Sequence, residues 1–292
     1  MKSTFRKGIA RVRKFRKDEE GLASTIGTMM AILVFLTLFS MILSQWMPVW
    51  IKDKEAEHMR EVEQDFADLR SKMDMQLLVG NKYLSVYTPV ELGTGGIPIF
   101  SSGSRGSLFL DTTGFRLVLS NSTIRLKEAR GGIYYKAYNQ QYLSLNYILE
   151  NGALMVEHSD QSINVIDPHI TFLNTTAGVT VTITLFNIMG TSTTMTGQGT
   201  AGIYTKLIYN ETMHWVNTST SRSEEKIFFS IETKYPTAWE LFLNRSINTP
   251  AENNIRYTQG YNLTRTAKGV DFDVSYVNEL ILNYGIIEVV VK

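Results

Sequence analysis

The sequence predicts an α+β protein in which a long N-terminal transmembrane and amphipathic helix precedes an all-β, sandwich-like ectodomain. Three observations predict this class. Residues 21–51 contain no charged side chain, the next thirty alternate apolar and charged residues at helical spacing, and the remainder breaks into short β-branched and aromatic runs separated by turn residues. We therefore expect four parts, which are a basic cytoplasmic leader (1–21), a transmembrane helix (22–51), an amphipathic helical extension (52–80) and an extracellular β-rich domain (81–292).

The uncharged run is long enough to cross a lipid bilayer. At 1.5 Å per residue, a helix over 21–51 is about 45 Å long, compared with about 30 Å for the hydrocarbon core. Residues 26–43 hold ten Leu, Ile, Val or Phe side chains, whose insertion gains on the order of 3 to 6 kcal/mol. The alternative, a buried helix of a soluble protein, usually has 8 to 20 residues and a polar face. Membrane lipid is therefore the first expected partner.

The flanking charges predict the orientation of this helix. The leader carries eight Lys and Arg and three acidic residues, so the positive-inside rule places it in the cytoplasm and everything after Ile51 outside. Trp46 and Trp50 suit the outer membrane interface, and Pro48 predicts a kink close to that boundary. Beyond the leader the chain has four more acidic than basic residues, so we expect no nucleic-acid partner.

Cysteine is absent from the chain. This excludes disulfides, zinc–thiolate and iron–sulfur sites, and thiol chemistry. An exported domain of this kind must be stable through its hydrophobic core alone. No cofactor is expected.

The junction of leader and apolar run carries a recognisable pattern. The segment RKFRKDEEG joins LASTIGTMMAILVFL, and it resembles the class III signal of archaeal type IV pilin-like proteins. The resemblance implies that a prepilin peptidase cuts between Gly21 and Leu22 and that the mature helix packs with other pilin-like subunits. Thr25 stands where a Pro is frequent in that family, and Ile26 stands at the fifth mature position, where bacterial pilins have Glu. An uncleaved single-pass anchor is the alternative.

The helical extension has one narrow apolar seam. Its members recur three or four residues apart, which is the spacing of one helix face. They are Met59, Val62, Phe66, Leu69, Met73 and Leu77. Two roles remain open for this seam, namely assembly with helices of other subunits and packing against the chain's own β-domain.

The β-rich part consists of runs at spacings typical of a sandwich or barrel, with one or two sandwiches possible. Residues 179–185 alternate apolar side chains with Thr, so one face of that strand is wet. Asn151-Gly152 predicts a tight hairpin, and Pro236 predicts the start of a short helix over 236–244. We expect flexible or exposed loops over 93–98, 101–106 and 188–202. The predicted strands cover 83–88, 107–111, 115–120, 123–129, 132–138, 142–150, 153–158, 170–174, 179–188, 202–210, 226–233, 270–277 and 286–291.

A second resemblance lies within this part. The segment GGIYYKAYNQQYLSLNYILENGALMVEHS and the YPTAWELF helix are similar to patterns in large β-rich ectodomains attached to archaeal pilin-like helices. The resemblance implies the fold and an extracellular compartment, and it implies no activity.

Six Asn-x-Ser/Thr sequons lie in the expected ectodomain, which predicts surface N-glycans there. They begin at Asn121, Asn174, Asn210, Asn217, Asn244 and Asn262. Chance occurrence in Asn- and Thr-rich loops is the alternative.

The sequence gives little support for catalysis or for metal binding. None of the four histidines has the spacing of a metal motif, and no Gly-x-Ser-x-Gly nucleophile motif is present. The set Glu157, His158, Asp160, Asp167 and His169 could in principle hold a metal, but solvated loop residues explain it better. A polar outer strand face likewise explains Asp271 and Asp273 better than a calcium site. We predict neither an enzyme nor a metal protein.

The function expected from these features is that of a pilin-like surface subunit. Its helix would anchor it in the cell membrane and assemble into or cap a type IV pilus-like filament, and its β-head would serve adhesion or display. The first alternative is a permanently membrane-anchored, non-polymerising ectodomain that binds surface glycans or S-layer components. The second is a tethered hydrolase.

Overall fold

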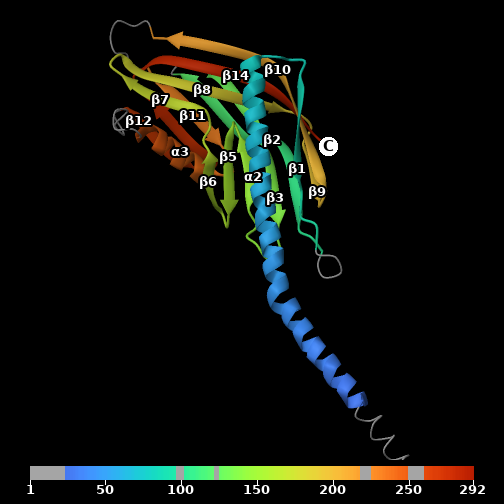
Figure 1. Cartoon of the computed structure of the whole chain (residues 1–292). Coiled ribbons are helices and arrows are strands. Elements are labelled where there is room, and N and C mark those ends of the chain that lie inside the picture. The colour runs from blue at the N-terminus through green and yellow to red at the C-terminus, as the bar shows by residue number, and fades with distance from the viewer. Residues whose placement is uncertain (1–23, 97–101, 122–124, 218–224, 249–259) are drawn as a thin grey trace, which may run out of the picture. The chain divides into compact units, whose positions relative to one another are not determined.

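The computed structural model describes residues 24–96, 102–121, 125–217, 225–248 and 260–292 (Figure 1). The chain divides into two units, Met1–Asp53 and Lys54–Lys292. The predicted class is confirmed, because one long apolar N-terminal helix precedes a strand-rich domain. The helical extension from Lys54 onward belongs to the same compact unit as the strands.

The long helix runs from Ser24 to Val79. It contains a π-helical turn, η1 (Ile42–Trp46), and continues as α2 (Met47–Val79). At this turn the backbone N–H of Met47 donates to the carbonyl of Ile42, five residues back. The kink expected at Pro48 stays a prediction, and the structure has a π-helical turn immediately before this residue. Pro48 has no N–H to donate to the carbonyl four residues back, so one regular α-helical hydrogen bond is missing from the preceding turn in any case.

In its described residues, the second unit contains two sheets and one helix besides α2. One sheet has the order β1-β10-β14-β8-β7 and the other the order β12-β13-β11-β2-β3-β4-β5-β6, with β9 paired to β2. The strands are β1 (Ser85–Glu91), β2 (Arg105–Asn121), β3 (Arg125–Tyr138), β4 (Asn146–Glu150), β5 (Ala153–His158), β6 (Gln161–Ile166), β7 (Ile170–Thr175), β8 (Gly178–Met189), β9 (Thr193–Gly197), β10 (Thr200–Val216), β11 (Ile227–Glu232), β12 (Tyr261–Thr266), β13 (Gly269–Val274) and β14 (Val277–Val291). The helix is α3 (Pro236–Asn248), and Pro236 opens it as predicted.

The two sheets pack face to face over a common core. Phe172 of β7, Phe229 of β11 and Phe272 of β13 form a ring cluster with centroids 5.4 to 5.9 Å apart. Trp239 of α3 stacks on Phe115 of β2 at 5.6 Å and closes this core along one side. The predicted sandwich-like architecture is therefore confirmed, and this core contains side chains of both sheets.

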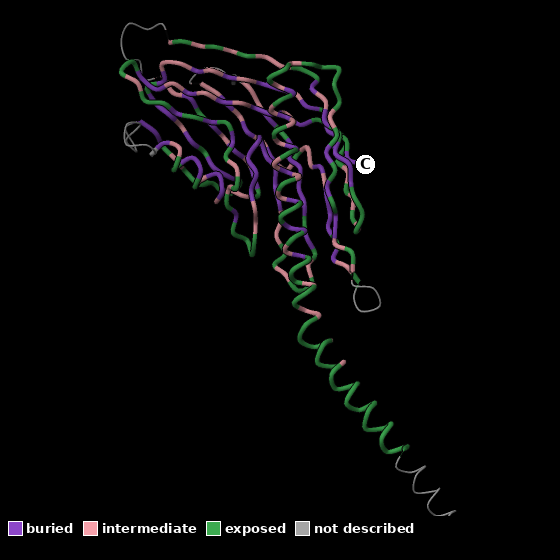
Figure 2. The backbone as a smooth tube through the Cα atoms, viewed as in Figure 1, coloured by how far each residue is buried: buried purple, intermediate pink, exposed green. Residues whose placement is uncertain are grey.

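A second core lies between the sheets and the charged half of α2. The part of α2 beside the sheets carries buried positions between exposed ones (Figure 2). The buried apolar side chains are Met59, Val62, Phe66, Leu69 and Met73, and Leu77 is partly buried. They pack against inward side chains of both sheets. Of the two roles left open for the seam, the structure has the intramolecular one: the seam belongs to the chain's own β-domain and presents no free face for another helix. At about 1.5 to 3 kcal/mol for each fully buried side chain, the five contribute roughly 10 kcal/mol.

Two glycines show why α2 and the hairpin fit closely. A Cβ on Gly285 of β14 would lie 2.9 Å from a terminal methyl group of Leu77, so a larger residue there would require the Leu77 side chain to move. Asn151 and Gly152 both have positive φ, at 48° and 75°, between the paired strands β4 and β5. This is the turn that Asn-Gly predicts.

Several other predictions need correction. The segment 188–202 is no simple loop, because Thr193–Gly197 forms β9 on β2. The segment 101–106 leads directly into β2, and its last residue, Gly106, is buried. Strands β6 and β12 were not predicted, and the predicted pairs 107–111 with 115–120 and 123–129 with 132–138 each form one long strand. β14 also pairs in parallel with β8, whereas sandwiches are usually antiparallel.

Candidate functional site

The first candidate site is the apolar half of the long helix. An 18-residue window of this helix has a mean hydropathy of 2.4, and none of it is buried. Exposed side chains include Ile32, Leu33, Phe35 and Leu36, each more than half accessible. An apolar helix surface of this length is far larger than the apolar patches of soluble monomers. This part of the chain is compatible with a membrane anchor.

A carboxylate fixes the start of the docked part of α2. Glu55 is fully buried and accepts hydrogen bonds from the backbone N–H groups of Gln140, Gln141 and Tyr142, at 2.7 to 2.8 Å. These residues form the loop between β3 and β4. Three backbone donors converging on one carboxylate make strong, charge-assisted hydrogen bonds. The part of α2 that packs on the sheets is therefore held by these hydrogen bonds at its beginning as well as by its apolar seam.

The second candidate site is a groove at the other end of α2. It has a volume of about 610 Å³ and is lined by the helix end and by the outward face of the five-stranded sheet. The helix contributes Leu77 and Leu78, and the sheet contributes hydroxyl and amide side chains. Those of the sheet are Thr171, Thr182, Thr184, Asn210, Thr212 and Asn283. The predicted wet Thr face of β8 is thus one wall of this groove.

Charged residues lie along the same groove. His169 Nε2 is 3.0 Å from the Asp74 carboxylate and 3.1 Å from Arg70 Nη2. Arg70 also donates to the Asp167 carbonyl at 2.9 Å, which ties α2 to the segment before β7. The groove can therefore offer hydroxyl, amide, imidazole and carboxylate groups beside aliphatic side chains, which is a chemistry suited to a polyhydroxylated ligand.

A buried carboxylate lies in the core at the end of β4. Glu150 is fully buried and accepts hydrogen bonds from Tyr134 Oη, Thr233 Oγ1 and Trp239 Nε1, at 2.8 to 3.2 Å. Burial raises the pKa of Glu150 to about 7, although the three donors oppose the rise. The neighbouring Asn151 accepts from the Phe186 N–H of the other sheet. These contacts join α3, β3 and both sheets, and they fit a structural role, because the carboxylate has no access to a substrate.

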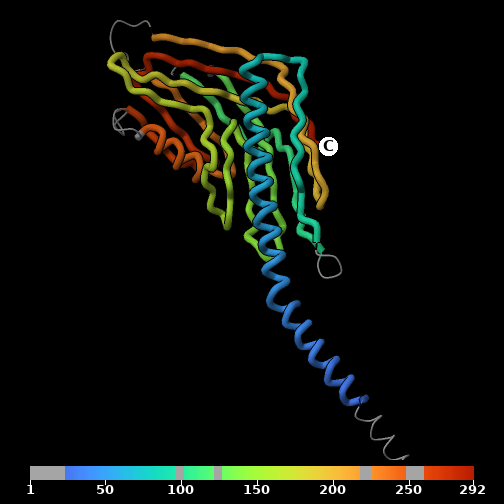
Figure 3. Tube along the Cα trace, viewed as in Figure 1, coloured from blue at the N-terminus to red at the C-terminus, as the bar shows by residue number. Residues whose placement is uncertain are grey.

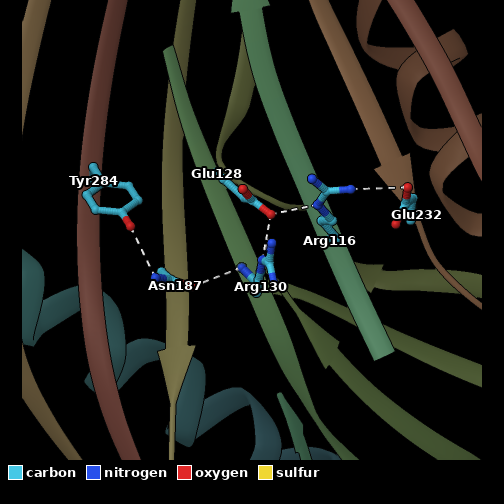
Figure 4. Close-up of polar contacts among 6 residues, drawn as sticks. All are labelled: Arg116, Glu128, Arg130, Asn187, Glu232 and Tyr284. Carbon is cyan, nitrogen blue, oxygen red and sulfur yellow. Dashed lines mark hydrogen bonds and ion pairs between the residues drawn. The ribbon is translucent and has the colours of Figure 1, made fainter. Parts of the chain in front are cut away.

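A second polar cluster joins strands of the two sheets (Figure 4). Glu128 of β3 pairs with Arg116 of β2 at 2.6 Å and with Arg130 at 2.5 Å. The Arg130 backbone N–H donates to Asn187 of β8, whose amide donates to Tyr284 Oη of β14. Every member has a protein partner, so we interpret the cluster as a structural link between sheets. No sequence pattern predicts this cluster, since its members come from four strands that are brought together only by the fold.

Four of the six sequon asparagines lie at one end of the sandwich. In the larger sheet, Asn121 pairs with Ile227 at the start of β11, and Asn262 pairs with Asp273 near the end of β13. In the smaller sheet, Asn174 pairs with Val179 near the start of β8, and the Asn217 N–H donates to the Asn278 carbonyl. The Val277 N–H donates to the Glu225 carbonyl, which joins the two sheets at this end.

The other two sequon asparagines lie elsewhere. Asn244 is exposed on α3, and Asn210 lines the groove, where its Nδ2 atom is 3.2 Å from the Cβ position of Gly80. A glycan at Asn210 would have to share that space with the end of α2.

The residues considered for metal binding in the sequence are not brought together. Asp167 pairs with Arg245, His169 with Asp74, Glu157 with Asn146, and His158 approaches the Ser144 carbonyl. Asp271 accepts from Ser230, and Asp273 lies 4.0 Å from Lys226. Gly21 and Leu22, the predicted cleavage junction, lie outside the described residues.

A family model matches residues 50–271, which is most of the chain. It is described as a family of unknown function, DUF7289. No curated protein and no solved structure matches the chain.

Proposed function

Since the chain belongs to the family of unknown function DUF7289, we propose its role from its own residues: a single-pass, membrane-anchored surface protein with a pilin-like build. In this proposal residues 24–51 lie in lipid or among like helices, the basic leader faces the cytoplasm, and the β-domain is displayed outside. The role is assembly and display, and we assign it no catalysis.

One observation carries the proposal. Within a single helix, the apolar residues up to Ile51 are largely exposed, whereas the apolar residues from Met59 onward are buried in a β-domain. A soluble protein would have to cover the first set, and lipid covers it at a gain of several kcal/mol. The resemblance of the leader to class III signals supports pilin-like processing, and the buried seam restricts any helix-to-helix assembly to the part before Lys54.

The runner-up is a permanent anchor that never polymerises and whose domain binds envelope glycans or S-layer components. The groove beside Leu78 favours it, because a cavity of about 610 Å³ lined by hydroxyl and amide groups suits a sugar-like ligand.

N-terminal sequencing of the membrane-extracted protein tests the proposal and separates the two candidates. We expect the mature chain to start at Leu22 and a Gly21→Phe variant to keep the leader. Start at Met1 in both proteins would favour the permanent anchor. Recovery of the unprocessed protein in the soluble fraction without detergent would overturn both candidates.

A further inference from the structure

A cluster of carboxylates surrounds a buried histidine where α2 passes the edge strand β1. His58 and Glu61 come from α2 and Glu91 from the end of β1, and one potential ligand atom of each lies within 4.8 Å of the others. Asp65 follows one turn later on α2. Among the described residues, Glu61, Asp65 and Glu91 form no ion pair with a basic side chain, so the negative charge of this cluster is uncompensated.

The histidine has one nitrogen that no protein group uses. His58 is only 3% exposed, and its Nδ1 is buried without a hydrogen-bond partner. Its Nε2 lies 3.0 Å from Tyr135 Oη, and this hydroxyl donates its own proton to the Leu92 carbonyl at 2.9 Å. With the hydroxyl proton on this carbonyl, the hydroxyl accepts from Nε2–H, and we assign the tautomer in which Nδ1 is unprotonated with a free lone pair.

This arrangement is the one that proteins build around metal-binding imidazoles. A ligating histidine usually donates its second ring N–H to a fixed acceptor, which sets the tautomer and orients the ring. Here Tyr135 is that acceptor and is itself held by a backbone carbonyl. We propose that His58 Nδ1, Glu61 and Glu91 bind one divalent transition-metal ion of the Zn²⁺ or Mn²⁺ class, with Asp65 beside them. One imidazole with two or three carboxylates suits these ions.

The electrostatics of the cluster agree with this assignment. Burial lowers the pKa of His58, although the neighbouring carboxylates of Glu91 and Glu61 oppose the shift. Burial also raises the pKa of Asp65 to about 6, and Glu91 and Glu61 add to the rise by repulsion. A bound cation would relieve that repulsion. Because Glu61 and Glu91 are exposed, their side chains can close the remaining distance to a common ion without disturbing the core.

Zinc titration of the full-length protein in detergent micelles tests the site. The protein is stripped with chelator, freed of any polyhistidine tag and titrated with ZnCl₂ by calorimetry. We expect one ion per chain, and at least about tenfold weaker binding in Glu61→Gln and in Glu91→Gln. Glu57→Gln is the matched control, because Glu57 is an exposed acid on the same helix that pairs only loosely, at 4.0 Å, with Arg60. It should bind like the wild type.

Cobalt substitution adds a readout of the ligands themselves. Co²⁺ bound to the wild type should give visible absorption bands that change in His58→Gln. His58 is buried, so its replacement also perturbs packing. The zinc affinities of the two variants of exposed glutamates are therefore the decisive measurement. Equal affinity of the wild type, Glu61→Gln and Glu91→Gln would overturn the proposal, as would the absence of a one-to-one site or an equal loss in Glu57→Gln.

Discussion

The two parts of the long helix differ in what covers their apolar side chains. Before Ile51 the apolar residues surround the helix and are exposed, whereas after Lys54 they form one seam that is buried in the β-domain. Charged residues begin at Lys52, where the change occurs. The comparison teaches that one helix can suit two environments. Apolar residues all around the helix suit lipid, and a single apolar stripe suits packing against a protein core. Each prediction below tests one side of this contrast.

The largest effect is expected from Phe66→Ala. Phe66 is fully buried and lies 6.3 to 6.5 Å from the rings of Tyr135 and Tyr147. Its truncation should lower the free energy of unfolding of the β-domain by about 4 kcal/mol and leave membrane association unchanged. Denaturant unfolding followed by tryptophan fluorescence measures the loss. Met75→Ala, on the exposed side of the same helix, should cost less than about 0.5 kcal/mol; equal losses would contradict the docked seam.

A charged residue introduced into the apolar half of the helix should impair membrane insertion and leave the stability of the β-domain unchanged. Leu33→Arg is expected to disfavour membrane insertion by about 3 kcal/mol, since arginine is costly at the centre of a bilayer. Flotation of cell membranes and alkaline extraction measure the fraction that remains inserted. Leu78→Arg makes the same change at a position that is 83% exposed at the end of α2. It should insert normally, and a similar loss in both variants would argue against lipid as the environment of Leu33.

Part of the pH dependence of stability should come from a buried carboxyl group in the core of the β-domain. The pKa of Glu150 is raised by burial from 4.5 to about 7 in the folded protein, so folding favours its protonated form. Its contribution is complete below pH 4.5 and is lost as the pH rises through about 7, which amounts to on the order of 3 kcal/mol. Glu150→Gln should flatten this slope.

Unfolding in urea at several pH values between 4 and 8 provides the measurement. In the Gln variant one amide oxygen can still accept from Trp239, while the amide group donates to Tyr134. Glu288→Gln, exposed on β14, is the control and should keep the wild-type slope. A wild-type slope in Glu150→Gln would show that other groups govern the dependence.

The smallest effect is expected at the boundary between the two parts. Glu55→Gln replaces the carboxylate that accepts three backbone N–H groups by a side chain with one acceptor. We expect a loss of about 2 kcal/mol in unfolding free energy and faster amide exchange in Gln140, Gln141 and Tyr142. Hydrogen exchange measured by mass spectrometry reports both. Unchanged exchange in this loop would mean that the seam alone holds the helix.

Local patterns were sufficient for much of the fold. The uncharged run, the seam spacing, the alternation in β8 and the Asn-Gly turn each depend on neighbours in sequence, and each predicted its element. The strands that were missed lack such a pattern: Thr193–Gly197 is small and polar, and Gln161–Ile166 places two apolar residues, Ile163 and Val165, on an exposed face. The parallel pairing of β14 with β8 depends on long-range packing, which no local pattern encodes.

The site residues were harder to predict for the same reason. The spacing of apolar residues identified the seam, but it could not show what the seam packs against. The same spacing serves an intramolecular and an intermolecular contact. His58 and Glu91 lie far apart in the sequence, and only the pairing of β1 with β10 beside α2 brings them together. The Glu150 network likewise collects donors from β3, the segment before α3, and α3 itself. Such groups carry no spacing signature.

The position of β14 has a consequence for how the protein is made. This strand comes last among the described elements, yet it lies in the middle of its sheet between β10 and β8. Its residues Ile287, Val289 and Val291 also belong to the core under α2. During synthesis α2 leaves the ribosome long before β14, whereas other members of this core, such as Leu108 of β2 and Ile133 of β3, are made earlier. The earlier strands can therefore cover only part of the seam of α2, and the core is completed only when translation has reached β14.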